Sequence, residues 1–508
     1  MIDINPKIKN LEELASIVEK LKSEGKVVSH CHGTFDLMHL GHIKHFESAK
    51  KIADVLVVTI TQDQYVNKGP GRPVFSEILR AEAVASLQCV DYVAINQWPN
   101  AVETIKLIKP NFYVKGGEYR SGLEDTNRGI FKENEAVKSV GGQIYFTDEI
   151  TFSSSHFINN YLSTYSESVR DFLKKFRAKY SAADVKQKIK ELKSMKVLVI
   201  GDAVIDEYHF SRPLGKSGKE NLVVMQYLKE ELYAGGILAL ANHLASFCDD
   251  VHLVTTLGSK DSKTEFISKA LKPNISTKFF YRADAPTVVK RRFVDSVFLN
   301  KLFEIYYFED SHLPQDISTQ IKDYLNNVIG DYDLVIVLDY AHGFLNPELI
   351  DVISRESKFL AVNTQTNSAN YGFNLITKYP RADYICIDEP ELRLATHQKF
   401  APVEDLTKEV ANKLNAKKVM ITRGHRGSTA FSDEEFYHTP VFSTKIVDRV
   451  GAGDAFLAIT SPCVAAGFPM DLVSFIGNIA GALKIQVVGN KSSVESDTLL
   501  KAIDAMLK

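Results

Sequence analysis

The chain has 508 residues, 45% hydrophobic and 24% charged, with a formal net charge of -2 at pH 7. This length predicts more than one domain, and the balanced charge argues against nucleic acid or an anionic membrane as a partner. Five scattered cysteines without a CxxC pair argue against a disulfide framework or thiolate zinc site, and no signal-peptide core or membrane-length apolar run is present, so we expect a cytoplasmic protein.

The first third of the chain alternates buried-strand and helix patterns. One helix-period stretch is "SEILRAEAVASLQ", residues 76–88. The strand-like segments are "KVVSHCHG" (26–33), "VLVVTI" (55–60), "VDYVAI" (90–95), "NFYVKGG" (111–117) and "GQIYF" (142–146). Strands that alternate with helices predict a parallel, doubly wound α/β sheet.

Five histidines fall between the first strand and the helix that follows, in "HCHGTFDLMHLGHIKHFESAK" (30–50). The carboxyl end of a strand that opens a helix is where α/β sheets bind ligands, and the first N–H groups of a helix favour anions. Gly33 and Gly41 would let a nucleotide come close. His39 and His42 could then donate hydrogen bonds to phosphate oxygens, whereas a zinc site would need a third ligand that the sequence does not offer.

The segment "GTFDLMHLGH" resembles the HxGH nucleotidyltransferases of the cytidylyltransferase-like group. "GRPVFSEILRAEAVASLQCVDYV", "PNFYVKGGEY" and "FSSSHFINNYL" extend the likeness, over about residues 25 to 163, to the bacterial domain that makes ADP-heptose. The resemblance implies that a sugar 1-phosphate attacks the α-phosphorus of ATP, or of CTP, with Mg2+ present and pyrophosphate leaving.

The same resemblance assigns roles to residues, with His39 and His42 as the catalytic pair. It implies nucleotide or phosphate contacts for Gly33, Thr34, Phe35, Gly41, Lys44, Lys68, Arg72, Lys115, Gly116, Ser153, Ser154 and Ser155. We expect Asp36 to fix the turn, and His30, His32 and His45 to have packing or surface roles.

A lysine-rich stretch without glycine or proline follows and carries apolar residues at helical spacing. It predicts one or two connecting helices, so we divide the chain into a first domain (1–165), a helical linker (166–195) and a second domain (196–508). Strand patterns resume at "KVLVIGDAVID" (196–206) and continue through "VHLVTTLG", "DLVIVLDY", "KFLAVNT", "DYICIDE" and "KVMITRG". The second domain is therefore also predicted to be a doubly wound α/β sheet.

The strongest motif of the second domain is "DRVGAGDAFLAI", from Asp448. Gly451, Ala452 and Gly453 at a helix start would make an N–H-lined anion hole. Asp454 follows at once, where it could take a proton from a substrate hydroxyl, as phosphoryl transfer to an alcohol requires. The alternative is a helix-capping aspartate after a glycine turn.

"GAGDAF" resembles the signature of the ribokinase family of carbohydrate kinases. "GGILALANHLASF" is similar to that family's sugar motif, "ITRGHRG" to its ATP-side turn, and "LDYAHGFL" and "TVVKRRFVD" to heptose 7-phosphate kinases. The likeness implies sugar-binding roles for Asp206, Gly235, Gly236 and Asn242, ATP-side roles for Thr422, Gly424 and Gly427, and an indirect Mg2+ site at Asp388 and Glu391.

Four positions depart from the family pattern on the ATP and metal side: Arg449, His342, Asn363 and Asp388. They put the rate and nucleotide choice of the kinase in question, whereas its base and anion hole are intact. The two halves together predict a bifunctional kinase and nucleotidyltransferase, with the transferase first and a heptose phosphate as the favoured sugar.

Two alternatives stay open: a CTP-dependent enzyme on another polyol or sugar phosphate, and a kinase half that has become a binding or regulatory module. By analogy with both families we expect a homodimer.

Overall fold

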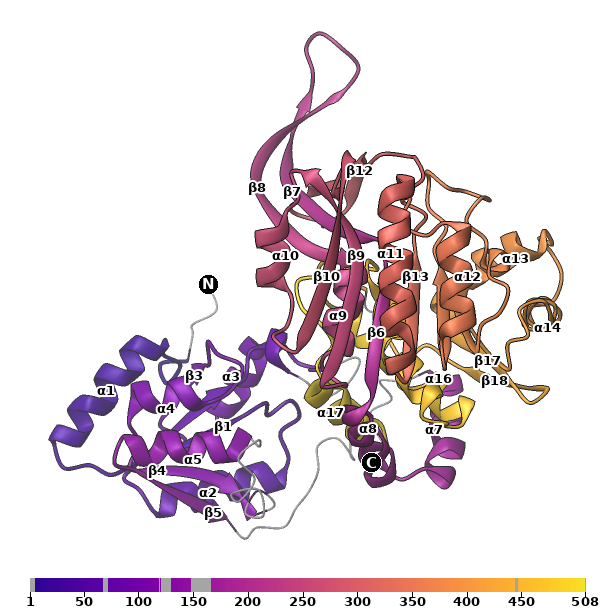
Figure 1. Ribbon diagram of the computed structural model, residues 1–508. Coiled ribbons are helices and arrows are strands. Elements are labelled where there is room, and N and C mark those ends of the chain that lie inside the picture. The colour runs from indigo at the N-terminus through magenta and orange to yellow at the C-terminus, as the bar shows by residue number, and fades with distance from the viewer. Residues whose placement is uncertain are drawn as a thin grey trace. The chain divides into compact units, whose positions relative to one another are not determined.

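A computed structural model of the chain describes residues 5–66, 72–117, 119, 129–147, 166–443 and 446–507 (Figure 1). The chain forms two compact units, one that ends at Ser166 and one that runs from Glu167 to Leu507. Within the described ranges, no helix has both the length and the apolar character that crossing a membrane requires.

The first unit is built on a five-stranded parallel sheet with the order β3-β2-β1-β4-β5. Its strands are β1 (Val28–Gly33), β2 (Val55–Ile60), β3 (Tyr92–Ile95), β4 (Phe112–Gly116) and β5 (Gln143–Thr147). Its helices are α1 (Leu11–Ser23), α2 (Leu40–Lys51), α3 (Glu77–Ala85), α4 (Val102–Ile108) and α5 (Gly129–Ser139). The predicted doubly wound fold is confirmed for this unit.

Helices cover both faces of this sheet, which explains why β2 is buried at every residue and is apolar except at Thr59. One core cluster joins the strands to Phe46 of α2 and Val84 of α3. A second cluster joins them to Leu14 of α1 and Ile108 of α4. The strand order reverses at β1, so the carboxyl end of β1 is the switch point at which such sheets bind ligands.

The second unit contains a nine-stranded sheet with the order β10-β9-β6-β13-β14-β15-β16-β17-β18, parallel except at its last two strands. These strands are β6 (Lys196–Gly201), β9 (Asp250–Lys260), β10 (Ile275–Pro286), β13 (Leu334–Asp339), β14 (Leu360–Thr364), β15 (Tyr384–Asp388), β16 (Lys418–Thr422), β17 (Ser428–Ser432) and β18 (Glu435–Thr439). This architecture confirms the predicted α/β class.

The helices of the second unit pack on this sheet and close its core. They are α9 (Ile237–Leu244), α10 (Thr264–Ala270), α11 (Gln315–Val328), α12 (Pro347–Glu356), α13 (Glu389–Thr396), α14 (Val403–Lys413), α15 (Ala452–Ala465), α16 (Met470–Lys484) and α17 (Ser496–Leu507). Figure 1 shows α11 and α12 side by side over one face of the sheet.

A separate four-stranded sheet, in the order β12-β11-β7-β8, completes the second unit. Its strands are β7 (Ala203–Lys216), β8 (Val223–Gly236), β11 (Val288–Asp295) and β12 (Lys301–Tyr307). The β7–β8 hairpin extends far beyond the rest of this unit (Figure 1). Residues two apart on a strand share a face, so Asp206 and Tyr208 of β7 lie on the same side of this sheet.

The predicted linker contains two helices, α7 (Glu167–Lys179) and α8 (Ala182–Glu191), and both belong to the second unit. The Phe176 ring of α7 stacks on Phe475 of α16 with 4.2 Å between centroids. Lys186 of α8 forms a 2.9 Å ion pair with Asp504 of α17. These helices are packed parts of the second unit rather than a free connection.

Candidate functional sites

The histidine motif of the first unit lies at the switch point of its sheet. Strand β1 ends at Gly33, and His39 is the N-cap of α2. The Gly41 N–H donates to His39 Nδ1 at 3.1 Å. Because Nδ1 is an acceptor, the proton of a neutral His39 ring lies on Nε2.

The rings of His39 and His42 stack, with 3.8 Å between centroids and 21° between planes. The motif spacing therefore places two imidazoles together at the first turn of α2, where the helix dipole favours an anion. Two polarisable donors beside a helix start suit the growing charge on a phosphate chain.

The absent side chain of Gly33 makes room for Phe35 rather than for a ligand alone. A Cβ at Gly33 would lie 2.8 Å from the Phe35 ring. Phe35 is buried with a positive φ of 47°, and its ring meets Phe46 with 4.9 Å between centroids. Thr34 and Phe35 can therefore serve a phosphate through their backbone, while the Phe35 ring is part of the core.

A buried arginine that the sequence reasoning missed supports this loop. The Arg80 side chain is 1% exposed and donates to the backbone oxygens of Thr34, Thr61 (2.7 Å) and Phe75 (3.0 Å). It also pairs with Asp63 at 2.6 Å. In the sequence, Arg80 stands in an ordinary amphipathic helix, so nothing local distinguishes it from a surface residue.

Asp36 anchors a segment distant in sequence, at Val74 and Phe75, and its role in fixing its own turn stays a prediction. Its Oδ1 accepts the N–H groups of Val74 (2.7 Å) and Phe75 (3.1 Å), and Arg72 lies 3.4 Å from Oδ2. Arg72, predicted near the phosphates, thus contacts this buried carboxylate.

Two other predicted residues of this unit, Lys115 and Lys44, form ion pairs with carboxylates. Lys115, at the end of β4 beside Gly116, forms a buried 3.1 Å ion pair with Glu133. Lys44 pairs with Glu47 at 2.7 Å on the exposed face of α2. Lys68, Ser153, Ser154 and Ser155 lie outside the described residues.

The three remaining histidines bond within the protein. Thr59 Oγ1 lies 2.8 Å from His30 Nε2 and 2.9 Å from His32 Nδ1. Burial, followed by the charge of Lys115, lowers the pKa of His32 to about 3, so this ring is neutral. His45 Nδ1 lies 2.9 Å from Thr147 Oγ1.

The second site is built around the first turn of α15. Its N-cap, Gly451, has a φ of 75°, which favours glycine. A Cβ at Gly451 would lie 2.3 Å from Asn490 Oδ1, whereas a Cβ at Gly453 would meet nothing within 4 Å. The Gly451-Ala452-Gly453 turn is therefore packed on its inner side and open at Gly453.

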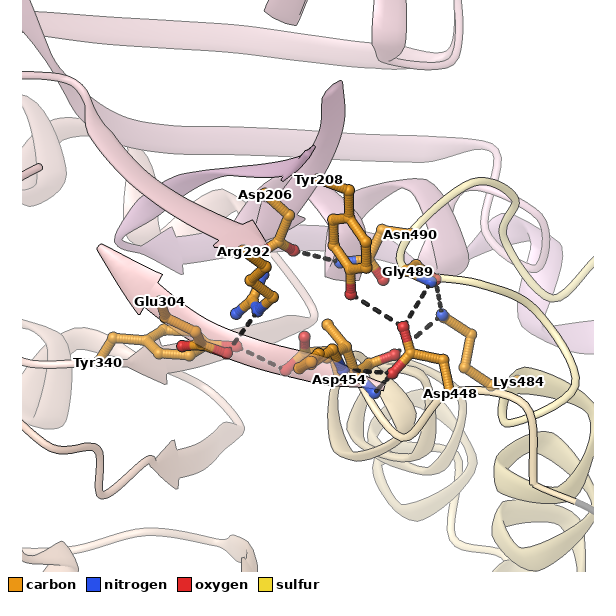
Figure 2. A network of polar contacts seen from close by, with 12 residues as sticks. Asp206, Tyr208, Arg292, Glu304, Tyr340, Asp448, Asp454, Lys484, Gly489 and Asn490 are labelled. Carbon is orange, nitrogen blue, oxygen red and sulfur yellow. Dashed lines mark hydrogen bonds and ion pairs between the residues drawn. The ribbon is translucent and has the colours of Figure 1, made fainter. Parts of the chain in front are cut away.

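Asp454 is buried beside this turn. The Tyr340 hydroxyl donates to Asp454 Oδ1 at 2.9 Å (Figure 2). Burial raises the pKa of Asp454 to about 6, against the opposing effect of this hydrogen bond. The carboxylate is thus ionised at neutral pH, with a pKa close enough to neutrality for it to act as a base.

Asp206 lies close by on β7 and is held by groups from two other segments. It pairs with Arg292 of β11, and its Oδ2 accepts from Asn490 Nδ2 at 2.9 Å (Figure 2). Arg292 also binds Glu304 of β12 at 2.8 Å. A Cβ at Gly235 would come 2.3 Å from Asp206 Oδ2, so the predicted glycine pair makes room for this carboxylate.

Asp448, which opens the motif, joins the strands of the small sheet to the anion-hole loop. It accepts from the Tyr208 hydroxyl (2.9 Å), Lys301 Nζ (2.6 Å) and the Gly489 N–H (2.9 Å). Figure 2 shows Asp206, Asp448 and Asp454 in one network that draws on β7, β11, β12 and α15.

The family model described as pfkB family carbohydrate kinase matches residues 194–497. The chain belongs to this family. The model described as cytidylyltransferase-like matches residues 30–217, which covers the first unit's site and overlaps the start of the pfkB match.

Curated relatives match the nucleotidyltransferase part. The bifunctional protein HldE of Geobacter metallireducens is 37% identical over 171 residues, 32% of this chain and 33% of that protein. HldE of Aliarcobacter butzleri is 40% identical over 141 residues, 27% of this chain and 29% of that protein. The chain thus spans about a third of the length of these relatives.

Among solved structures, phosphofructokinase-2 from Escherichia coli in complex with substrates and products has a TM-score of 0.50 at 13% identity. The match covers 61% of this chain and 98% of that one. At this identity the likeness shows the fold alone, and that fold is the one seen in the pfkB unit.

The predicted ATP side of the pfkB unit lies around the β16–β17 turn. Gly427 has a φ of 80°, and a Cβ there would lie 2.0 Å from the Thr439 carbonyl oxygen, so only glycine fits. Gly424 has a φ of 55°, and Thr422, the last residue of β16, pairs with Ser428.

The predicted Mg2+ pair forms the capping box of α13 in the pfkB unit. Asp388 Oδ1 accepts the Glu391 N–H at 2.7 Å, and Glu391 accepts the N–H groups of Asp388 (2.8 Å) and Thr366 (2.9 Å). Burial, followed by the charge of Asp388, raises the pKa of Glu391 to about 8. These bonds suit contact with a hydrated ion better than direct coordination.

The remaining departures from the family pattern also have structural partners. Asn363 Nδ2 donates to the Cys386 carbonyl at 2.6 Å, and His342 is buried with its ring 5.1 Å from that of Phe308. Arg449 is exposed.

Asn242, predicted to bind sugar, bonds the backbone at Ala270 (2.9 Å) and Lys272 (3.0 Å) and lines a pocket of about 240 Å³.

Proposed function

We propose that this chain is a bifunctional enzyme of nucleotide-sugar synthesis. The pfkB unit would phosphorylate a sugar phosphate with ATP and so form a sugar bisphosphate. After a separate phosphatase has removed the other phosphate group, the cytidylyltransferase-like unit would transfer a nucleotidyl group to the sugar 1-phosphate. The observation that carries the kinase proposal is the buried Asp454 carboxylate beside the open first turn of α15.

In the kinase reaction, Asp454 takes the proton of the acceptor hydroxyl as the hydroxyl oxygen attacks the γ-phosphorus of ATP. The N–H groups at the start of α15 receive the charge that develops on the transferred phosphoryl group. Tyr340 holds the carboxylate by its 2.9 Å hydrogen bond, and Asp206, with Arg292, would orient the sugar.

The favoured acceptor is D-glycero-D-manno-heptose 7-phosphate, phosphorylated at O1. The HldE name of the matched relatives and their description as bifunctional proteins support two activities in one chain. The likeness of "LDYAHGFL" and "TVVKRRFVD" to heptose kinases supports the sugar.

In the transferase reaction, an oxygen of the sugar 1-phosphate attacks the α-phosphorus of ATP, or of CTP, and pyrophosphate leaves. His39 Nε2–H and the His42 ring would stabilise the charge that builds on the phosphate chain. The chain needs no covalent intermediate for this step, because both reactants are held at one helix start.

Mg2+ would enter with the triphosphates as part of both substrates. In the pfkB unit, Asp388 and Glu391 would contact the hydrated ion through water, consistent with their capping bonds.

We also propose a cytoplasmic homodimer. Exposed apolar side chains on the β7–β8 hairpin, including Leu214, Val223 and Tyr227, support an association surface there.

The kinase proposal is tested by ADP release from ATP with a panel of sugar phosphates that includes heptose 7-phosphate. Turnover on one member, lost in Asp454→Asn, is the expected result. Binding of a sugar phosphate without turnover would favour the alternative of a binding or regulatory module. The structural partners of His342 and Asn363, two departures from the family pattern, are the observation that favours this alternative.

The transferase proposal is tested by pyrophosphate release with each sugar 1-phosphate in ATP and in CTP. A preference for ATP would agree with the heptose assignment, and a preference for CTP would indicate another polyol or sugar phosphate. A His39→Ala chain that releases pyrophosphate at the wild-type rate would contradict the phosphate site.

A further inference from the structure

Lys484, the last residue of α16, is a fully buried charged residue near the pfkB site. The residue is 0% exposed. Lysine is rarely buried completely, because an ammonium loses its hydration when it leaves water. Such a burial requires a specific set of partners.

The partners of Lys484 lie on both sides of the anion-hole loop. Its ammonium donates to the carbonyl oxygens of Val450 (3.1 Å) and Gly489 (2.5 Å). A Cβ at Gly451 would lie 3.1 Å from Lys484 Cε, so the lysine stem passes directly against the first glycine of the turn. Figure 2 shows the ammonium reaching toward Gly489 and the segment beside Asp448.

The charges around Lys484 come from several elements. Burial lowers the pKa of Lys484 to about 8, while Asp454, Asp448 and Asp206 oppose this and Lys301 adds to it. The ammonium is therefore charged at neutral pH and loses its proton as the pH rises through 8.

We propose that Lys484 is the built-in cation of the kinase anion hole, a positioning residue that holds the Val450–Gly451 turn in its phosphate-binding form. Two observations carry this role. The ammonium binds the carbonyl that directly precedes Gly451, and a second carbonyl from the loop after α16 completes its site.

The charge of Lys484 has a second effect, on the phosphate itself. A cation buried behind N–H groups adds positive potential in a region of low dielectric, where screening is weak. The same charge favours the ionised form of Asp454, which the base role needs. Lys484 thus supports both halves of the reaction without touching a substrate.

The inference rests on the proposed kinase activity, so its test includes a readout that does not need turnover. Lys484→Met keeps the length of the side chain and removes the charge. Lys484→Ala removes the stem and ammonium that n-propylammonium can replace. Lys418→Met is the matched control, because Lys418 of β16 is a half-buried lysine of the same unit that also bonds a backbone carbonyl, that of Val464 at 3.4 Å.

We expect Lys484→Met to lower kcat for ADP release about 100-fold with little change in KM for the sugar phosphate, and Lys418→Met to retain wild-type kcat. Added n-propylammonium should raise kcat of Lys484→Ala at least about tenfold, whereas 1-propanol, of equal length but uncharged, should not. Wild-type kcat should fall above about pH 8. Far-ultraviolet circular dichroism and a cooperative thermal transition of the variant chains report that the pfkB unit is folded.

A Lys484→Met chain with wild-type kcat would overturn the inference, as would a folded Lys484→Ala chain that n-propylammonium does not restore. If the wild type turns over no sugar phosphate, the kinase proposal fails separately. The affinity for ATP, measured by calorimetry, then tests the role of Lys484. A lower affinity in Lys484→Ala that n-propylammonium restores would support this role, and an unchanged affinity would contradict it.

Discussion

The two proposed phosphate sites of this chain have the same architecture but different chemical groups. Each lies where a helix begins at the edge of a parallel sheet, at α2 in the first unit and at α15 in the second. The first places two imidazoles at the helix start, and the second places glycines there with a buried carboxylate behind them. A transferase must stabilise a leaving pyrophosphate, whereas a kinase must also remove a proton from an alcohol.

The two sites also share a hidden feature. Arg80 in the first unit and Lys484 in the second are fully buried cations that bind backbone carbonyls of the phosphate loop. In each unit this buried cation holds the backbone near the helix start, and the groups of the helix start itself are left to contact the ligand. The comparison predicts that each activity can be removed without disturbing the other.

The largest effect is expected for Asp454→Asn, which should lower kcat for ADP release by about 10³-fold, because the amide cannot accept the proton. The measurement is initial ADP release at pH 8, with pyrophosphate release by the same chain as the control. Comparable losses in both activities would mean that the two sites are not independent.

His39→Ala should lower pyrophosphate release about 10²-fold, because it removes one of two stacked donors at the start of α2. ADP release should be unchanged. His45→Ala is the matched control, since His45 lies one turn further along α2 and bonds Thr147. Equal losses in the two variants would contradict a special role for the HxGH pair.

Arg80→Met should destabilise the first unit by about 2 kcal/mol or more, because it leaves several carbonyl oxygens of the loop unpaired. The chain has one tryptophan, Trp98, and it packs in the core of the first unit. Its fluorescence during denaturant unfolding therefore reports on this unit. An unchanged denaturant concentration at the unfolding midpoint would contradict the structural role of Arg80 that likens it to Lys484.

The smallest effect is expected for the pH profile. With the pKa of Asp454 at about 6, kcat for ADP release should be half-maximal near pH 6 and highest below the fall expected as Lys484 loses its proton near pH 8. Tyr340→Phe removes a hydrogen bond that stabilises the carboxylate, so the pKa rises and the limb moves up by about one pH unit. A limb that moves to lower pH would contradict the base assignment.

The sequence was sufficient to predict two doubly wound units and the helix starts that carry their motifs, because strand patterns and glycine turns are local signals. Tyr340, Arg292 and Lys484 could not be found that way, since each meets its site from a segment distant in sequence. Lys484 sits in "GALKIQVV", which reads as an ordinary helix end.

Two expectations gained a different physical basis from the structure. The Asp388-x-x-Glu391 spacing, interpreted as a metal contact, also fits the sequence signature of a capping box, and the structure contains that box. Gly33, interpreted as space for a nucleotide, is space for the Phe35 ring.

The docking of α7 and α8 changes where the chain can be divided. A cut placed at the first strand of the kinase fold, before β6, would leave Phe475 without the Phe176 ring that covers it and Asp504 without Lys186. A cut at Glu167 keeps these pairs together. The compact second unit therefore begins about thirty residues before the match to the pfkB family model.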